Sequence, residues 1–410
     1  MTKEKSTVPR LRFPGFTDAW KQRKLGEVAT FAKGNGYSKK DLVIKGSPII
    51  LYGRLYTKYE TVISEVDTFV SVEDNKNSVV YSEGGEVLVP ASGESSLDIA
   101  RASVVAKKGI ILGGDINIIR LHSEIFPVFL ALTISNGKQQ KGLSKRAQRK
   151  SVVHLHNSDL KKVDLDFPTL PEQEAIGSFF SDLDQLITLH QRKLDDVKEL
   201  KKALLQKMFL KGNGNDFPEL RFPEFTDAWK QRKLGEVAEM YSGGTPSVGR
   251  KDYYAGGIPF IRSAEINSDT TELYLTELGL NNSSAKMVSK GSLLYALYGA
   301  TSGEVGLSRL DGAINQAILA ILPNDDLTTE FLMYWLRREK STIVEKYLQG
   351  GQGNLSAGIV KQLEPTIPTL PEQEAIGSFF SDLDQLITLH QRQLDHLKLL
   401  KKALLQQMFI

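Results

Sequence analysis

Residues 168–210 read PTLPEQEAIGSFFSDLDQLITLHQRKLDDVKELKKALLQKMFL, and residues 368–410 repeat this stretch with 37 of 43 positions identical. A shorter repeat precedes each long one, because LRFPGFTDAWKQRKLGEVA at residues 11–29 recurs at residues 220–238 with 18 of 19 positions identical. The segments enclosed by these repeats, residues 30–167 and 239–367, hardly resemble one another. The chain therefore consists of two units with constant ends and variable middles.

The long repeat predicts a long helix in each unit. Pro171 and Glu172 suit a first helical turn, where an N–H is not needed and a carboxylate meets the positive end of the dipole. The apolar residues then return on a seven-residue cycle, which is typical of a helix that packs along another helix, and Phe179, Leu186 and Leu200 widen the stripe. The predicted seam comprises Ile176, Phe180, Leu183, Ile187, His190, Leu194, Val197 and Leu204 in the first copy, and Ile376, Phe380, Leu383, Ile387, His390, Leu394, Leu397 and Leu404 in the second.

The best available cover for each stripe is the other copy, so we predict an intramolecular coiled coil of two helices. A duplicated unit pairs naturally with its copy about a pseudo-two-fold axis, which favours antiparallel packing. At 1.5 Å per residue, about 40 residues give a rod of roughly 60 Å. His190 and His390 would then approach each other on the axis. We interpret them as buried polar residues that fix the helix register, and a pH-sensitive or metal-binding pair is the alternative.

The variable middles predict two compact α+β domains. Short β-rich runs lie at residues 44–52, 87–90, 110–121, 258–261, 292–297 and 313–322, whereas residues 124–136 and 328–346 look helical. Residues 114–117 (GDIN) resemble residues 312–315 (GAIN), which favours one fold with two surfaces; a chance match of four residues is the alternative. The expected fold class is α+β, with two mixed α/β domains separated by two long antiparallel coiled-coil helices in an internal pseudo-two-fold repeat.

The repeats also predict the boundaries of the parts. We expect a flexible tail at residues 1–10 and a glycine-rich flexible linker at residues 212–219. The first domain with its constant segment spans residues 11–167, and the second spans residues 220–367. The helices that separate them are predicted at residues 168–211 and 368–410.

Composition narrows the class of protein without fixing its function. A chain of 410 residues with 41% hydrophobic content can bury two or three domain cores. It has no cysteine and no apolar leader in its first ten residues, which predicts a cytoplasmic protein without disulfides. No apolar stretch reaches the ~18 residues that a spanning helix needs, so we expect no membrane partner. The net charge of +3 permits nucleic-acid binding.

Motifs for catalysis are missing from the sequence. We find no phosphate-binding G-x-x-x-x-G-K-[ST] loop, no G-x-S-x-G nucleophile elbow and no acidic-Pro-Pro-aromatic motif for methyl transfer. His154 and His156 with Asp159 form the one concentrated set of metal-ligand types, but a clear third ligand is missing and ordinary surface residues are the better interpretation. We therefore expect a binding role, with no catalytic residue and no metal site.

Both variable segments contain polar and basic residues interleaved with aromatic residues. This pattern is expected of a surface that reads a nucleic-acid groove. In the first domain, residues 52–59 (YGRLYTKY) alternate aromatic and cationic side chains, and residues 141–150 (KGLSKRAQRK), interpreted as a loop, carry five cations and no acid. That basic run either contacts phosphates or is a solvated loop. The candidates in the first domain are Tyr52, Arg54, Tyr56, Lys58, Lys141, Lys145, Arg146, Arg149 and Lys150; those in the second are Thr245, Ser247, Arg250, Lys251, Arg262, Ser263, Gln349, Gln352 and Asn354.

This layout resembles the specificity subunit of type I restriction-modification enzymes along essentially the whole chain after the N-terminal tail. The resemblance rests on the LPEQEAI openings at Leu170 and Leu370, on helices that end in LLQ-x-MF, on SGGTPS at residues 242–247 and on NLS at residues 354–356. The first domain departs from the pattern, because residues 33–38 read KGNGYS. Its base-contacting residues are therefore less well defined than those of the second domain.

The resemblance implies a non-catalytic subunit that reads DNA. Each domain would bind one half of an asymmetric bipartite duplex target, and the helices would set the gap between the halves. Two methyltransferase subunits, and two restriction subunits in the full complex, would be partners for adenine methylation or ATP-dependent cleavage. S-adenosylmethionine, ATP and magnesium would bind the partner subunits, and no cofactor is expected on this chain. The alternatives are a hydrolase or nuclease centred on His154 and His156, and a scaffold or RNA-binding tandem protein.

Overall fold

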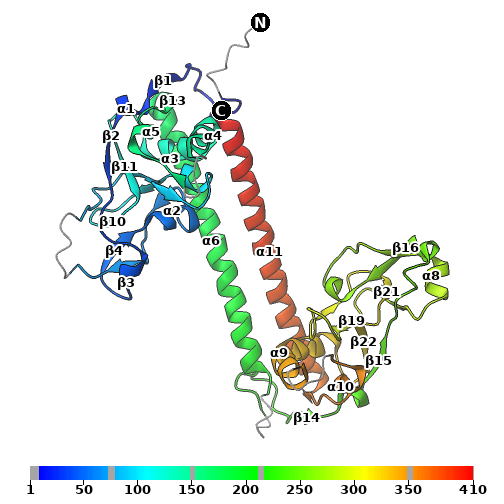
Figure 1. Cartoon of the computed structure of the whole chain (residues 1–410). Coiled ribbons are helices and arrows are strands. Elements are labelled where there is room, and N and C mark those ends of the chain that lie inside the picture. The colour runs from blue at the N-terminus through cyan, green and yellow to red at the C-terminus, as the bar shows by residue number, and fades with distance from the viewer. Residues whose placement is uncertain (1–8, 73–78, 148–152, 211–216, 349–353, 410) are drawn as a thin grey trace. The chain divides into compact units, whose positions relative to one another are not determined.

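The structure is a computed structural model that describes residues 9–72, 79–147, 153–210, 217–348 and 354–409 (Figure 1). The chain divides into two compact units: unit 1 holds residues 1–192 and 391–410, and unit 2 holds residues 193–390. Each unit contains one variable domain and half of each long helix. The finer boundaries that the repeats predict, with a tail at residues 1–10 and a linker at residues 212–219, stay predictions and fall partly outside the described residues.

Both long repeats form unbroken helices of 39 residues, α6 (Leu170–Met208) and α11 (Leu370–Met408). In unit 1, Asp184 of α6 forms an ion pair with Lys401 of α11. In unit 2, the repeat-related pair joins Asp384 of α11 to Lys201 of α6. Low-numbered residues of one helix thus meet high-numbered residues of the other in each unit, which confirms the predicted antiparallel packing.

The predicted seam is buried along both helices. Eight of its positions are less than 9% exposed: Ile176, Phe180, Leu183, Ile187, Leu194, Ile376, Phe380 and Leu394. The other eight are half-buried: His190, Val197, Leu204, Leu383, Ile387, His390, Leu397 and Leu404. The predicted approach of His190 to His390 involves one residue of each unit and stays a prediction.

The wider stripe predicted from Phe179, Leu186 and Leu200 is wrong. These side chains are 36%, 40% and 51% exposed, because two paired helices bury a narrower strip than a helix covered by several neighbours. Apolar side chains therefore remain on the outer faces of both helices.

The end of each long helix is anchored in a variable domain. In unit 1 the ring of Phe409 lies 5.8 Å from Phe129 and 6.3 Å from Phe180. In unit 2 the corresponding Phe209 lies 5.3 Å from Phe331 and 6.0 Å from Phe380. Each long helix therefore starts beside the domain of one unit and ends in the core of the domain of the other unit.

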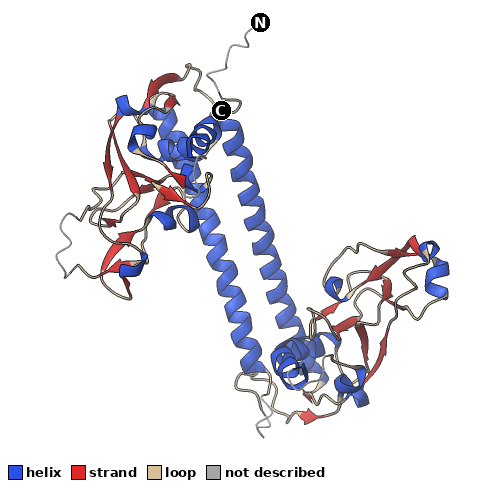
Figure 2. Cartoon of the chain, in the orientation of Figure 1, coloured by secondary structure: helices blue, strands red, loops and turns tan. Residues whose placement is uncertain are grey.

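The domain of unit 1 is built on a five-stranded sheet with the order β2-β11-β7-β9-β5, beside a four-stranded sheet with the order β10-β4-β6-β3 (Figure 2). Short two-stranded pairs, β1-β13 and β12-β8, complete it. The strands are β1 Lys21–Lys24, β2 Ala29–Lys33, β3 Leu42–Val43, β4 Ser47–Ile50, β5 Val62–Ile63, β6 Phe69–Val70, β7 Val87–Pro90, β8 Ser92–Gly93, β9 Ser103–Val105, β10 Ile111–Leu112, β11 Ile116–Leu121, β12 Val153–His154 and β13 Asp164–Phe167. The helices are α1 Leu25–Val28, η1 Lys39–Asp41, α2 Tyr52–Thr57, η2 Asp98–Ala100, α3 Pro127–Ser135, α4 Gly137–Ala147 and α5 Asn157–Leu160.

The domain of unit 2 follows the same plan, with sheets of order β15-β22-β19-β20 and β17-β16-β21-β18 and the pair β14-β23. Its strands are β14 Lys230–Gln231, β15 Ala238–Ser242, β16 Tyr254–Ile261, β17 Tyr274–Leu275, β18 Lys286–Val288, β19 Leu293–Ala296, β20 Val305–Leu307, β21 Gly312–Ile314, β22 Ile318–Pro323 and β23 Thr366–Ile367. Its helices are α7 Leu234–Val237, η3 Lys251–Tyr253, η4 Ser263–Glu265, α8 Glu277–Asn281, α9 Thr329–Leu348 and α10 Ala357–Lys361. Among the described helices of the chain, none carries an apolar stretch long enough to cross a membrane.

Strand registers show which residues of the two domains correspond. Phe31 pairs with Ile119 in unit 1, and its repeat counterpart Met240 pairs with Ile321 in unit 2. Residues 114–117 therefore correspond to residues 316–319 and not to residues 312–315. The GDIN and GAIN match is out of register by four residues and is a chance match, but the shared strand order supports the prediction of one fold.

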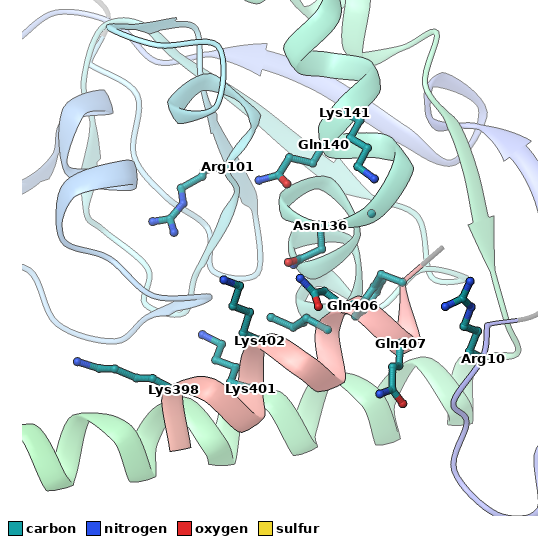
Figure 3. Close-up of a pocket in the computed structure, with 13 residues that line it drawn as sticks. Arg10, Arg101, Asn136, Gln140, Lys141, Lys398, Lys401, Lys402, Gln406 and Gln407 are labelled. Carbon is teal, nitrogen blue, oxygen red and sulfur yellow. The ribbon is translucent and has the colours of Figure 1, made fainter. Parts of the chain in front are cut away.

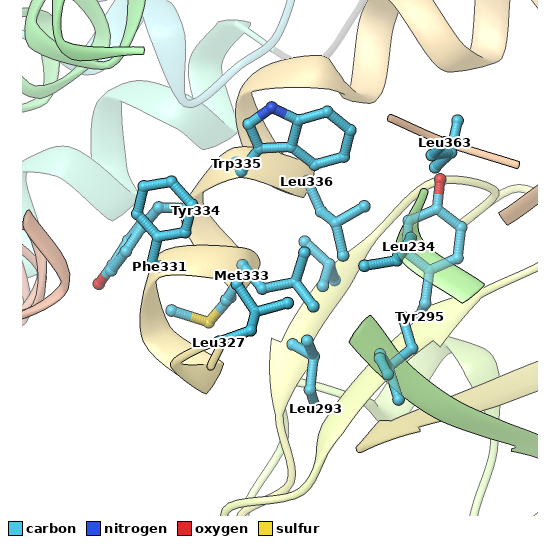
Figure 4. Close-up of a cluster of buried hydrophobic side chains, with 14 of the residues drawn as sticks. Leu234, Leu293, Tyr295, Leu327, Phe331, Met333, Tyr334, Trp335, Leu336 and Leu363 are labelled. Carbon is cyan, nitrogen blue, oxygen red and sulfur yellow. The ribbon is translucent and has the colours of Figure 1, made fainter. Parts of the chain in front are cut away.

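The buried core of unit 2 lies between helix α9 and the sheet that contains β19 (Figure 4). Phe331 and Leu336 from α9 meet Leu293 and Tyr295 from β19, and all four are at most 1% exposed. Burial of large apolar side chains stabilises such a core by about 1.5–3 kcal/mol each. This packing supports the sheet from which the loop after β15 emerges.

The predicted strands match the observed ones in some of the apolar runs and differ in others. Residues 87–90 form β7 as predicted, and residues 110–121 contain β10 and β11. The run at residues 44–52 is only partly a strand, because β4 ends at Ile50 and α2 starts at Tyr52. The four-residue spacing of Tyr52 and Tyr56 fits a helix, and the neighbouring apolar run obscures it.

Candidate nucleic-acid interface

One place is shared by the two domains and carries candidates in both. Ile49 of β4 pairs in parallel with Ile111, and Phe260 of β16 pairs in parallel with Ala313, at corresponding positions. The segment that follows each of these strands therefore has the same location in its domain. In unit 1 that segment is α2, and in unit 2 it is Arg262 with η4.

Helix α2 sorts its candidates onto two faces. Tyr52 and Tyr56 are four residues apart and their rings lie 6.5 Å from each other, whereas Arg54 lies on a different face and Lys58 follows the helix as its C-cap residue. Leu55 is 1% exposed and fixes the helix to the core. Burial raises the pKa of Tyr56, so this tyrosine stays a neutral hydrogen-bonding group.

Arg54 of α2 and the C-cap residue Lys58 converge on one carboxylate. The Arg54 guanidinium lies 2.8 Å from Asp67, and the Lys58 ammonium pairs with the same side chain. The hydrogen bond from Lys58 and the charge of Arg54 hold the pKa of Asp67 below its usual value. Arg54, Lys58 and Asp67 therefore form a cluster of fixed orientation with a net charge of +1.

The basic run at residues 141–150 begins as a helix, which corrects the prediction of a loop. Lys141, Lys145 and Arg146 lie on α4, and all three are exposed. Arg146 donates a hydrogen bond to the carbonyl oxygen of Asp159 at 3.0 Å. The run contains few apolar residues, but Leu143 is 1% exposed and lies in the interior of the domain. Arg149 and Lys150 lie outside the described residues.

The glycine-rich loop after β15 needs its first glycine for steric reasons. A Cβ on Gly243 would lie 1.8 Å from the carbonyl oxygen of Ile314, and one on Gly34 in unit 1 would lie 2.1 Å from that of Gly113. Beyond this close approach the exposed Thr245 donates a hydrogen bond from its hydroxyl to the side chain of Gln316. The two domains thus share the tight approach and differ in the side chains that follow it.

Arg262 is held by two carboxylates. Its guanidinium donates to Glu265 at 2.8 and 3.2 Å and to Glu272 at 2.6 Å. Burial alone would raise the pKa of Glu265, but hydrogen bonds from Arg262 and nearby backbone amides lower it to about 2. The same interactions raise the pKa of Arg262, so the pair stays ionised and the guanidinium has a fixed orientation.

Thr245 and Arg262 lie together at one hollow of unit 2. A cavity of about 310 Å³ is lined by these two residues and by Val248, Tyr254, Phe260, Leu273 and Asn315. Its polar groups, a hydroxyl, a guanidinium and an amide, are the types that bind base edges. Seventeen positions separate the two candidates in the sequence, and only the fold shows that they share a site.

None of the other described candidates of unit 2 is among the residues that line this hollow. Arg250 forms a two-pronged ion pair with Asp252 at 2.9 and 2.6 Å and stacks over the ring of Tyr253 at 4.6 Å. Ser247 and Lys251 are exposed, and Ser263 is half-buried in η4. Asn354 is exposed beside Leu355, while Gln349 and Gln352 lie outside the described residues.

The residues that position these groups could not be identified from sequence. Asp67, Glu265 and Glu272 orient the candidate arginines, but carboxylates repel phosphates and are not residue types that indicate a DNA-binding surface. Arg101 donates to the carbonyl oxygen of Tyr56 at 3.5 Å and is also absent from the predicted set. A lone arginine before a short strand carries no local signal that places it beside α2.

The histidine group forms ordinary local contacts. His154 Nδ1 lies 3.1 Å from Ser92 Oγ, and the rings of His154 and His156 stack with centroids 6.5 Å apart. Asp159 accepts a hydrogen bond from the backbone of His156. Across the described parts of the chain, no three potential metal ligands lie close enough to hold an ion.

The sequence matches the family described as type I restriction modification DNA specificity domain twice, at residues 17–199 and 226–399. The chain belongs to this family. It is a type I specificity subunit with two recognition domains. Specificity subunits are non-catalytic, so this chain is not an enzyme.

Relatives and solved structures agree with this assignment. A putative type I restriction enzyme MjaX specificity subunit from Methanocaldococcus jannaschii is 23% identical over 94% of this chain and 92% of its own. The EcoR124I/EcoR124II specificity subunit of Escherichia coli is 24% identical over 41% of this chain and 43% of its own. The crystal structure of the S subunit from M. genitalium has a TM-score of 0.67 at 16% identity and covers 98% of this chain and 99% of its own. The predicted fold class is therefore confirmed.

Proposed function

We propose that this specificity subunit binds an asymmetric bipartite duplex DNA target and that each recognition domain reads one half-site. The observation that carries the proposal is the shared place after β4 and β16. There, one fold presents two aromatic rings with Arg54 and Lys58 in unit 1, and a clamped Arg262 beside Thr245 in unit 2. Because the two domains share one fold but present different polar groups at this place, they would read two different half-sites.

The proposal includes the partners of the family. Two methyltransferase subunits would dock on the paired helices for adenine methylation, and two restriction subunits would join them for ATP-dependent cleavage. S-adenosylmethionine, ATP and magnesium would be held by those subunits and not by this chain, and the complex would act in the cytoplasm. A solved structure that concerns complex assembly of the type I system matches this fold with a TM-score of 0.52.

Exposed leucines on the helices support two equivalent docking surfaces. Leu189 and its repeat counterpart Leu389 are 47% and 52% exposed, and Leu186 and Leu386 are 40% and 38% exposed. Such apolar groups on a polar helix surface are typical of an interface with another subunit. Because they recur at the same repeat positions, they offer the same surface twice.

Modified-base sequencing tests the DNA part of the proposal. DNA from cells that express the chain with its methyltransferase should carry methyladenine in one split motif with two unlike halves. Arg262→Ala should relax one half only, and Arg54→Ala with Tyr52→Phe should relax the other only. If both variants alter the same half, or if no split motif is found, the assignment of one half-site to each domain is wrong.

Assembly with the methyltransferase subunits is tested separately, by substitutions that place a charge in the exposed leucine surface. Leu189→Asp and Leu389→Asp together should reduce co-purification with the methyltransferase subunit, and each single variant should release about one subunit. The matched control is Gln185→Asp, an exposed polar position on the same helix. Full assembly in the double leucine variant would remove these faces from the docking surface.

A further inference from the structure

Unit 1 holds a cavity of about 680 Å³ whose charged lining is entirely positive (Figure 3). Figure 3 shows the side chains of Lys398 and Lys402 extending from α11, and that of Arg101 extending from a different element. The full lining is Arg10, Arg101, Asn136, Gly137, Gln140, Lys141, Lys398, Lys401, Lys402, Leu405, Gln406, Gln407 and Phe409. Six of these residues are cations, four carry side-chain amides, and none is a carboxylate.

A break between two helices builds this cavity. Helix α3 ends at Ser135 and α4 begins at Gly137, whose φ of +64° is a conformation that glycine adopts without strain. The break turns Lys141 toward the C-terminal part of α11. In unit 2, the matching helix α9 runs unbroken from Thr329 to Leu348.

The lysines of α11 face the cavity because of their spacing. Lys398, Lys401 and Lys402 lie three and four positions apart and therefore share one face of the helix. Lys401 is bound to Asp184 and lies 3.3 Å from Glu60, so its charge is largely compensated within the protein. Lys398 and Lys402 are exposed, and their charges add to those of Arg10 and Arg101.

The corresponding place in unit 2 keeps the lysines and has Lys207 at the position of Gln407, but it carries carboxylates at two positions where unit 1 has arginines. Repeat positions equate Lys398 and Lys402 with Lys198 and Lys202. The amides of Leu11 and Leu220 donate to repeat-related carbonyls, which equates Arg10 with Glu219. The registers of β9 on β7 and of β20 on β19 equate Arg101 with Glu304.

We propose that this cavity is a phosphate-binding site of unit 1 that has no counterpart in unit 2. Several cations and amide donors around a concave surface suit a group with several anionic oxygens. Those oxygens belong either to a free polyphosphate or to a DNA backbone. The first source is independent of the proposed function, and the second rests on it. In both cases the site distinguishes one end of a pseudo-symmetric chain from the other.

Inorganic triphosphate is the probe for the first source. Titration calorimetry measures its affinity for the parent chain and for two double variants of the full chain. The unit 1 variant carries Lys398→Gln and Lys402→Gln. The matched control carries Lys198→Gln and Lys202→Gln. The unit 1 variant should bind about tenfold more weakly, the scale expected for loss of charged hydrogen bonds, and the control should bind like the parent chain. Arg101→Glu, which installs the residue type of Glu304, should weaken binding similarly.

Duplex DNA of unrelated sequence is the probe for the second source. If the backbone enters the cavity, the unit 1 variant should lower the slope of log affinity against log salt by about 0.9 for each phosphate that is no longer neutralised, and the unit 2 control should not. Circular dichroism melting checks that all variants stay folded. The proposal is overturned if neither probe responds to the unit 1 variant, or if both variants weaken binding equally. Triphosphate binding without DNA binding would count against the proposed function alone.

Discussion

Arg12 donates two parallel hydrogen bonds to Glu172, from Nε to Oε1 at 2.8 Å and from Nη2 to Oε2 at 2.6 Å. The glutamate is 1% exposed and sits in the first turn of α6, where a carboxylate also meets the positive end of the helix dipole. Arg221 and Glu372 repeat the pair in unit 2 at 2.7 and 2.8 Å. In each unit, this ion pair joins the short repeat to the start of the long repeat, which explains why the two repeats recur together.

Replacement of Arg12 should destabilise unit 1. Arg12→Met leaves Glu172 buried without its partner, which costs about 3–5 kcal/mol. Urea unfolding followed by circular dichroism should show a transition at a lower urea concentration than in the parent chain. Arg221→Met should have the same effect on unit 2. Arg12→Met combined with Glu172→Leu should recover most of the loss, because it removes the unpaired charge. An unchanged transition in the single variant would contradict this account of the pair.

A methyl group at Gly243 should disrupt the second recognition domain. The added Cβ of Gly243→Ala would lie 1.8 Å from a backbone carbonyl oxygen, so the loop or strand β21 must shift. We expect a lower melting temperature and weakened recognition of one half-site. Gly249→Ala is the control, because a Cβ there meets no atom within 4 Å. Equal melting temperatures for the two variants would contradict the steric argument.

The sequence predicts well what depends on local periodicity. Seam residues such as Phe180 and Leu394 follow the seven-residue repeat of helices that pack along each other, and β7 is a continuous apolar run. Interactions between distant segments leave no such pattern. Arg101 and Lys398 are far apart in the chain and line one cavity only in the folded unit, so the basic cavity could not be predicted.

Two wrong predictions have physical causes of the same kind. The lysine-rich stretch after Gly137 carries little apolar surface, which favours a loop, yet it forms a helix in which Leu143 is buried and Gln139 donates a hydrogen bond to the carbonyl oxygen of Asp164. The exposure of Leu186 could not be predicted because periodicity gives the width of a stripe but not how much of it a single partner covers. The clamp on Arg262 likewise depends on Glu272, ten residues away in a loop.

The contribution of Glu265 to the stability of unit 2 should be present at neutral pH and lost at low pH. Its pKa is lowered to about 2 in the folded chain, against an ordinary value of 4.5, by hydrogen bonds that include those from Arg262. The stabilisation is therefore fully present above about pH 5 and is lost as the pH falls toward 2. Glu265→Gln should lower the melting temperature at pH 7 but have little effect near pH 2. A difference that stays constant between pH 7 and pH 3, measured by scanning calorimetry, would contradict the assignment.

The basic run that begins on α4 is expected to bind phosphates. The variant replaces four cations with alanine: Lys145, Arg146, Arg149 and Lys150. DNA affinity should fall for every sequence, and the salt slope should flatten by about 0.9 for each phosphate that is released. The control removes the exposed Lys107 and Lys108, which lie in the turn before β10. An unchanged slope in the fourfold variant would remove this run from the interface.

The length of the paired helices should set the unread gap in the target. Each helix is continuous for 39 residues, so four residues inserted after Arg192 and after Arg392 lengthen both by about 6 Å, or roughly two base pairs. Four residues are close to one full turn of 3.6, and the seam therefore keeps its face. Two inserted residues rotate the seam by about 200° and should prevent pairing. Methylome sequencing should show a gap longer by about two base pairs with the same half-site letters; changed letters with an unchanged gap would exclude this role for the helices.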